Sequence, residues 1–181
     1  YVRRGVRLHP QNIGGHQERE RRGGTESVAN IVAFGKACEL VMEELGSLNV
    51  LRTLRDTFER KVVEVIPDIV FNGDRDRRLP NISNISFHSI EGEGLLINLD
   101  MQGVAVSTGS ACSSGSLEPS PVIRALGRSD ELARGAIRFS FGRFNTPEDV
   151  DDLLTVLPRA IETLRKLSPL STIDRQVGSD R

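Results

Sequence analysis

One stretch of small polar residues constrains this 181-residue chain more than any other. Residues 107–119 read Ser-Thr-Gly-Ser-Ala-Cys-Ser-Ser-Gly-Ser-Leu-Glu-Pro, with one thiol, Cys112, near the middle. Such side chains bury little apolar area, so the stretch is expected to be a mobile surface loop and not part of a core. A thiol in such a loop is exposed and can move, which favours a reactive cysteine. The alternative is a small buried hydrophobe, which is common for a lone cysteine.

The segments around this loop predict an α+β fold. The apolar run 103–106 before the loop reads as a strand, and residues 120–127 after it read as a short helix that ends at a glycine. A third segment, 136–141, alternates, which places Ile137 and Phe139 on one face of a strand and Arg138 on the other. Two further strands are expected at 69–71 and 82–87, and four helices at 25–45, 51–67, 91–100 and 146–167.

The ends of two predicted helices carry specific signals. Thr146 and Pro147 suit the N-cap and the first position of the last helix, and Pro158 should kink or split that helix. Thr25 suits the N-cap of the first helix, where Cys38 falls on the apolar stripe and core packing explains it.

The first 24 residues have little periodicity and predict a long basic loop. They hold six arginines against two glutamates, Glu18 and Glu20. One interpretation is a solvated loop. The other is an anion or partner site, because the loop leads into a helix N-terminus at Thr25. Nucleic acid is disfavoured, since the net charge is −1 and no aromatic residues alternate with the arginines.

Several classes of site and location are disfavoured by the composition. Cys38 and Cys112 lie far apart in the sequence, so we expect no disulfide framework. The expected location is the reducing cytoplasm. The three histidines show no metal-ligand spacing with either cysteine, so we expect no metal. No apolar run approaches eighteen residues and no signal leader opens the chain, so no membrane span is expected.

Three segments together resemble the cysteine desulfurases, and more narrowly those with a long catalytic loop that supply sulfur for iron–sulfur clusters. They are Ser110-Ala-Cys-Ser-Ser-Gly-Ser-Leu-Glu-Pro119, Arg124-Ala-Leu-Gly127 and Ile137-Arg-Phe-Ser-Phe-Gly-Arg-Phe144. The basic segment 17–26 resembles that family's basic loop, with His16 and Glu20 standing where the family usually has glycine. The likeness runs in order over about residues 1–170.

The resemblance implies a homodimer that uses pyridoxal phosphate (PLP) to convert L-cysteine to L-alanine, a transferase of sulfur. It implies that Cys112 holds the sulfur as a persulfide for an iron–sulfur scaffold or another acceptor protein. Arg138 matches the arginine that binds the substrate carboxylate, although an exposed or structural strand arginine is the alternative. Thr25 matches the threonine that reaches the PLP phosphate of the opposite subunit, although helix capping alone would also explain it. The lysine that binds PLP is not expected among Lys36, Lys61 and Lys166, because all three lie in predicted helices.

The predicted organisation is therefore the small C-terminal domain of a fold-type I PLP enzyme together with the end of its large domain. Residues 1–24 would end the large domain, 25–170 would form the small domain with loop 107–119, and 171–181 would be a loose tail. Two other interpretations stay open. One is a PLP-independent sulfur carrier or interaction module, and the other is a related fold-type I enzyme in which Cys112 is incidental.

Overall fold

The computed structural model describes residues 2–108 and 118–168, which fall into two compact units, Tyr1–Gly46 and Ser47–Arg181. The predicted domain boundary at 24/25 stays a prediction, and the contacts group the first long helix with the N-terminal segment. No helix in this described part of the chain has the length and apolar character needed to cross a membrane.

The first unit consists of a glycine-rich loop, the short turn α1 (Gln17–Glu20) and the helix α2 (Val28–Glu44). The loop closes where the Gly23 amide donates to the Asn12 carbonyl at 2.7 Å. The prediction that Thr25 caps the helix is wrong. The N-cap is Ser27, whose carbonyl accepts the first helical hydrogen bond from Ile31 at 3.0 Å.

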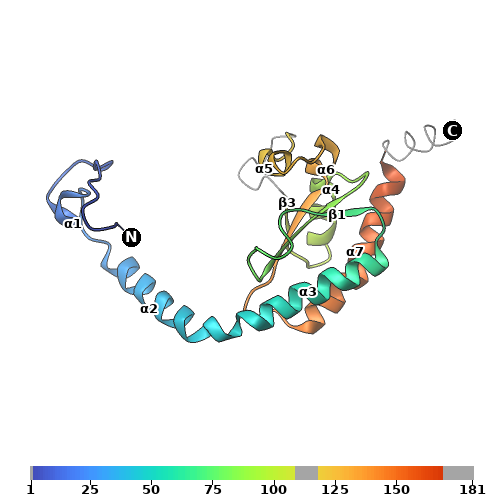
Figure 1. The fold of residues 1–181 in the computed structure, drawn as a ribbon, viewed down its shortest axis with the longest axis horizontal. Coiled ribbons are helices and arrows are strands. Elements are labelled where there is room, and N and C mark those ends of the chain that lie inside the picture. Colours follow the sequence, from blue (N-terminus) through green and yellow to red (C-terminus); the bar gives the residue numbers. More distant parts are fainter. Residues whose placement is uncertain (1, 109–117, 169–181) are drawn as a thin grey trace. The chain divides into compact units, whose positions relative to one another are not determined.

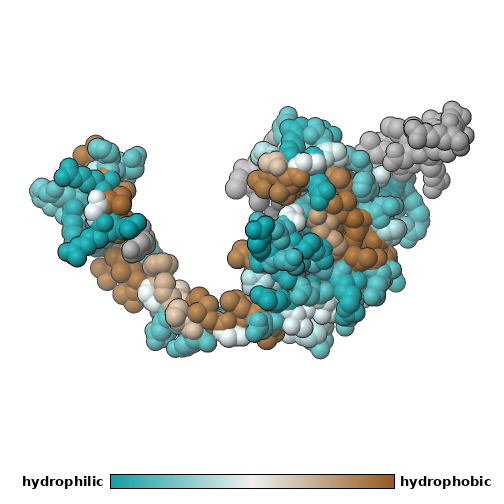
Figure 2. Space-filling model, in the orientation of Figure 1, coloured by the Kyte–Doolittle hydropathy of each residue, from teal (hydrophilic) through white to brown (hydrophobic). Residues whose placement is uncertain are grey.

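No side chain of α2 is buried, so the prediction that core packing explains Cys38 is wrong in this structure. Figure 2 shows apolar surface along this helix, to which Val28, Ile31, Val32, Phe34, Val41 and Met42 contribute exposed side chains. An apolar stripe is buried only by a second surface, and nothing described in the first unit packs on this one. A short 3-10 turn, η1 (Leu45–Ser47), follows α2.

The second unit is built on a four-stranded antiparallel sheet of order β1-β2-β4-β3 (Figure 1). The strands are β1 (Ile69–Phe71), β2 (Ile82–Phe87), β3 (Ser107–Thr108) and β4 (Ala136–Ser140). The strand predicted at 103–106 lies instead at 107–108. Val104 and Val106 pack partly buried against the core.

Three helices cover the core face of this sheet: α3 (Leu48–Val65), α4 (Gly92–Asp100) and α7 (Pro147–Leu167). Buried side chains from sheet and helices meet in one cluster, with Phe58 stacked in a tilted arrangement 4.8 Å from Phe139. The prediction that Ile137 and Phe139 share the inner face of their strand is confirmed, since both are buried while Arg138 is exposed.

The last helix begins as predicted, with Thr146 and Asp149 forming a reciprocal capping box. It then runs without a break through Pro158, so the predicted split is wrong.

Two short helices, α5 (Pro121–Ala125) and α6 (Asp130–Arg134), cover one end of the opposite face of the sheet. Ile123 and Ala133 from these helices bury Ala136 of β4. The sequence did not predict α6, because five residues are too few to show helical periodicity. The rest of that face carries the polar side chains described next.

Candidate active site

A row of polar residues crosses three strands of the sheet and ends just beyond the fourth, β1. The ladder pairs Asn84 of β2 with Arg138 of β4, and pairs Arg138 with Ser107 of β3. Asn72 extends the row one residue beyond β1, because its backbone N–H donates to the backbone carbonyl of Asn84 at 2.9 Å. Directly opposed residues of antiparallel strands share a face, and the neighbouring residues Ile85 and Ile137 lie in the core. The row therefore lies on the face away from the core.

Arg138 is the cationic member of this row. Its side chain is exposed, and among residues 2–108 and 118–168 it has no hydrogen-bond or ion-pair partner. An unpaired guanidinium presents a planar fork of donors suited to a carboxylate or phosphate. The strand alternation that the sequence predicted thus leaves an exposed cationic side chain on the open face.

Cys112 lies outside the described residues, as does the predicted mobility of its loop. The structure describes the two segments between which residues 109–117 run. On one side, β3 ends at Thr108, which pairs with Ile137. On the other side, Ser120 is buried just before α5. The first of these segments includes Ser107, directly opposite Arg138.

Four residues form a network that the sequence did not single out. Asn72 Nδ2 donates to Asn84 Oδ1 and to Ser86 Oγ, both at 2.7 Å, and Arg128 Nε donates to Asn72 Oδ1 at 3.2 Å. The only available signal in the sequence was that Asn84 and Ser86 are polar residues inside a predicted strand. Nothing in the sequence shows that strand 69–71 pairs with strand 82–87, which is what brings Asn72 to Asn84.

Thr25 lies in the first unit, and it is exposed. Its carbonyl accepts a hydrogen bond from Arg22 Nη2 at 3.0 Å, and Arg22 also donates to the carbonyls of Gly23 and Gly24. An exposed hydroxyl can donate a hydrogen bond to a phosphate group, whereas the Arg22 guanidinium donates to backbone carbonyls here. The structure does not bring Thr25 and Arg138 into one unit, so their roles stay predictions.

His16 and Glu20, where the sequence resemblance led us to expect glycine, contact each other. His16 Nδ1 lies 3.0 Å from Glu20 Oε1, and both side chains are largely exposed. Glu20 has φ 63°, a left-handed backbone conformation that favours glycine. A glycine at that position would adopt this conformation without strain.

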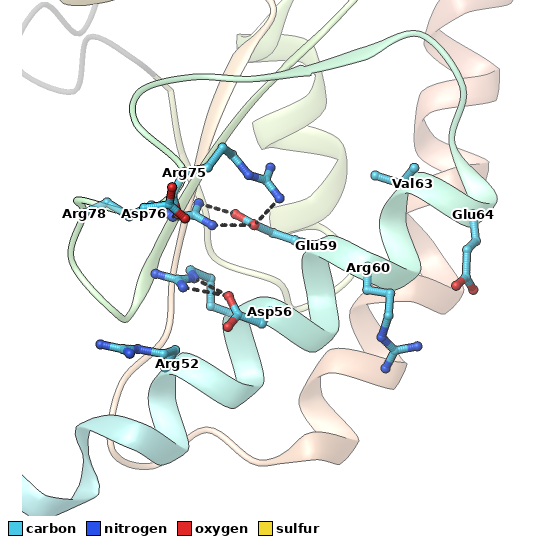
Figure 3. Close-up of a pocket in the computed structure, with 10 residues that line it drawn as sticks. Arg52, Asp56, Glu59, Arg60, Val63, Glu64, Arg75, Asp76 and Arg78 are labelled. Atoms are coloured by element: carbon cyan, nitrogen blue, oxygen red, sulfur yellow. Dashed lines mark hydrogen bonds and ion pairs between the residues drawn. The ribbon is translucent and has the colours of Figure 1, made fainter.

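A cavity of about 750 Å³ lies between α3 and the loop 72–80, where arginine and acidic side chains converge (Figure 3). Glu59, almost fully buried, accepts from both terminal nitrogens of Arg78 and from Ser83 Oγ. Burial alone would raise the pKa of Glu59. The hydrogen bonds from Arg78 and Ser83 and the charges of Arg75 and Arg78 outweigh it and hold the pKa below its usual 4.5. These groups satisfy one another, so the cavity is the edge of a structural ion-pair network.

The lysines of the sequence are each paired with an acid on a helix surface. Lys36 contacts Glu39 at 3.0 Å, Lys166 contacts Glu162 at 2.6 Å, and Lys61 contacts Asp151. None of them lies in the row that contains Arg138. Across residues 2–108 and 118–168, no group of three metal-ligating side chains occurs.

A family model supplies the observation that decides the relationship. The model for the aminotransferases of class V matches residues 4–153. The chain belongs to the class-V aminotransferase family. Pyridoxal phosphate is the cofactor of this family. Of the groups that could hold it, the described residues of this class-V chain offer an exposed hydroxyl and arginines for a phosphate, but no lysine placed to bind it covalently.

Within this family, the chain is similar to cysteine desulfurases, which confirms the resemblance noted from the sequence. It is 51% identical over 170 residues to cysteine desulfurase IscS of Dictyoglomus turgidum, covering 93% of this chain and 43% of that protein. It is 45% identical over 170 residues to cysteine desulfurase NifS of Azotobacter vinelandii, covering 93% of this chain and 42% of that protein. The class-V chain thus spans about two fifths of the length of these curated relatives.

A solved structure confirms the predicted fold class. The NifS-like protein from Rickettsia africae matches with a TM-score of 0.74 and 27% identity, over 89% of this chain and 41% of that one. The mixed α/β unit with its small antiparallel sheet is therefore part of a NifS-like, fold-type I architecture.

Proposed function

We propose that this chain is the part of a cysteine desulfurase that receives the sulfur. The reaction converts L-cysteine to L-alanine while the thiol of Cys112 becomes a persulfide. The C–S bond of the substrate breaks and an S–S bond to Cys112 forms. The β-carbon is reduced to the methyl group of alanine while the two sulfur atoms are oxidised to the persulfide, and the two thiol protons remain in the products. The relatives named cysteine desulfurase support this assignment.

One structural observation carries the proposal: Ser107, at the start of the segment that leads to Cys112, lies directly opposite Arg138, which has no partner among the described residues. Cys112 follows Thr108 by four residues, and an extended chain spans at most about 3.6 Å per residue. The nucleophile is thus tethered within about 14 Å of the strand end that pairs beside Arg138. A substrate whose carboxylate binds the Arg138 guanidinium would place its thiol within reach of that tether.

The cofactor in the complete enzyme would be pyridoxal phosphate, which serves as an electron sink for the substrate carbons. The residues of this chain would contribute at its phosphate, through the Thr25 hydroxyl, and at the substrate carboxylate, through Arg138. The fragment by itself is expected to form no alanine, because each of its three lysines pairs with an acid on a helix surface.

The same proposal includes a homodimer, a cytoplasmic location and an acceptor protein such as an iron–sulfur scaffold. The exposed apolar residues of α2 support a larger assembly, because an apolar stripe of this length is stable in water only when a second surface covers it. Membrane and nucleic acid partners are not part of the proposal.

Persulfide formation on Cys112 tests this function. The complete enzyme is incubated with L-cysteine, and the sulfur added to each cysteine is measured by peptide mass spectrometry before and after a reducing thiol. We expect one reducible sulfur on Cys112, none in the Cys112→Ser variant, and normal loading in the matched Cys38→Ser control. Retention of full persulfide loading and turnover by Cys112→Ser would reject the assignment.

The competing interpretation, a PLP-independent sulfur carrier, predicts a different result for the 181-residue chain alone. That chain would take a sulfur onto Cys112 from a small persulfide donor and pass it on without PLP. A desulfurase fragment would take up and pass on sulfur no faster than a free thiol in this assay.

A further inference from the structure

We propose that Asn84 is a second residue that binds the substrate carboxylate beside Arg138, and that Arg128 and Asn72 hold its amide in the binding orientation. This inference rests on the proposed function, because it takes the row around Arg138 as the place where the amino-acid substrate binds. It assigns roles to three side chains that the sequence analysis did not single out.

Arg128 sets the orientation of the Asn72 side-chain amide. A guanidinium only donates hydrogen bonds, so the Asn72 atom that lies 3.2 Å from Arg128 Nε must be the amide oxygen. Arg128 is itself held by a second hydrogen bond, from Nη2 to the Phe71 carbonyl at 3.1 Å. The side-chain amide of Asn72 is therefore fixed with its oxygen toward Arg128.

The same reasoning then fixes Asn84. Asn72 directs its nitrogen to Asn84 Oδ1 and to Ser86 Oγ, each at 2.7 Å. Since the Asn84 oxygen is occupied by this contact, the Asn84 nitrogen and its two N–H groups face the other way. Among the described residues, this nitrogen has no partner.

The strand register places these free donors beside Arg138. Asn84 and Arg138 are directly opposed across β2 and β4, and side chains in such pairs have Cβ atoms about 4.5–5.5 Å apart. An amide and a guanidinium at this spacing can each donate to one oxygen of a carboxylate. Ser86 is fully buried and Asn84 is half-buried, so the network is partly shielded from water on the side away from the ligand.

The test compares ligands with and without a carboxylate in the complete, PLP-loaded enzyme. L-Alanine carries the carboxylate, and cysteamine carries the amine and thiol of cysteine without it. We expect Asn84→Ala to weaken L-alanine binding roughly ten-fold or more, as measured by calorimetry, and to raise KM for L-cysteine to a similar degree. The affinity for cysteamine should stay within about two-fold of wild type, because losing a contact to an absent carboxylate costs nothing.

A matched control separates this role from a structural one. Asn81, the residue directly before the same strand, donates to the Phe141 carbonyl at 3.1 Å and lies outside the row. Asn81→Ala removes a comparable hydrogen bond, and any change in its affinities should be equal for L-alanine and cysteamine. Equal weakening of both ligands by Asn84→Ala would overturn the inference.

A second variant tests the orientation itself. Asn72→Asp keeps the contact with Arg128 but has no N–H to donate, so Asn84 must turn its nitrogen toward position 72. We expect the affinity for L-alanine to fall about as far as in Asn84→Ala, while the unfolding midpoint does not fall, because the new carboxylate pairs with Arg128. An unchanged affinity for L-alanine would show that Asn84 needs no orientation by Asn72.

Arg138→Ala distinguishes the failure of this inference from the failure of the proposed function. Loss of L-alanine binding in Arg138→Ala but not in Asn84→Ala would reject the role of Asn84 alone. Unchanged L-alanine binding in both variants would reject the row as the carboxylate site and the role proposed for Arg138 with it.

Discussion

Glu59 and Arg78 form a two-pronged ion pair in which the carboxylate is almost fully buried. Arg78 Nη1 lies 2.6 Å from Glu59 Oε1 and Nη2 lies 2.7 Å from Oε2, while the Glu59 side chain is 3% exposed. Arg75 adds a third contact at 3.0 Å to the same carboxylate. These contacts attach the loop 72–80 to α3, and Asn72 is the first residue of that loop. The ion pair thus stabilises the segment that orients Asn84.

Removing the Glu59 charge should destabilise the second unit. Glu59→Gln keeps the shape of the side chain but leaves two arginines facing an uncharged amide. We expect a loss of about 3 kcal/mol in the free energy of unfolding, at the low end for breaking a buried pair, because the Arg78 side chain is 16% exposed and can reach water. Urea denaturation of wild type and variant measures this loss of unfolding free energy. Glu64→Gln, on the exposed surface of the same helix, should change stability by less than about 0.5 kcal/mol.

The contribution of Glu59 should also depend on pH in a defined direction. Its pKa is lower in the folded chain than the 4.5 of the free side chain, since the contacts with Arg78, Ser83 and Arg75 outweigh burial. Below 4.5 the unfolded state binds the proton first, so the stabilisation is fully present above that pH and is lost as pH falls through the folded pKa. The difference in unfolding free energy between wild type and Glu59→Gln should therefore shrink between about pH 6 and about pH 3. A difference that stays constant or grows over this range would contradict the assignment.

Two glycines of the second unit should respond in opposite ways to alanine. A Cβ at Gly135 would lie 2.3 Å from the Phe87 carbonyl oxygen, which is backbone and cannot move aside. A Cβ at Gly94, inside α4, would meet Leu164 at an ordinary 3.5 Å. We expect Gly135→Ala to lose about 2 kcal/mol or more, and Gly94→Ala to be neutral or to gain up to about 1 kcal/mol from helix propensity. Thermal unfolding of the two variants beside wild type tests whether each one loses or gains stability.

The basic loop should become more rigid when Glu20 is replaced by glycine. Glu20→Gly removes a left-handed strain of about 1–2 kcal/mol, whereas the exposed contact with His16 that it loses is worth less than about 1 kcal/mol. Amide hydrogen exchange of residues 14–24 should therefore slow in Glu20→Gly. Glu26→Gly, where the backbone is not left-handed, should give no slowing, and a faster exchange in Glu20→Gly would show that the His16 contact is the larger effect.

The sequence by itself determined the elements whose signals are local. The α7 start depends on Thr146, Pro147 and Asp149, which are neighbours in the chain, and the alternation in 136–140 depends only on the two-residue repeat of a strand. The family resemblance also needed no structure, because the segments around Cys112 and Arg138 are contiguous.

Only the tertiary structure decided which distant residues meet. Arg138 lies between Asn84 and Ser107 because β4 pairs with both β2 and β3, and Glu59 meets Arg78 because α3 packs on the sheet beside the loop 72–80. The tertiary structure also decided which side chains are buried. Cys38 has the helical spacing of a core residue but is exposed, since an apolar stripe is buried only where a second surface covers it. Spacing along the chain sets which face a side chain occupies, whereas the packing of distant segments sets what that face contacts.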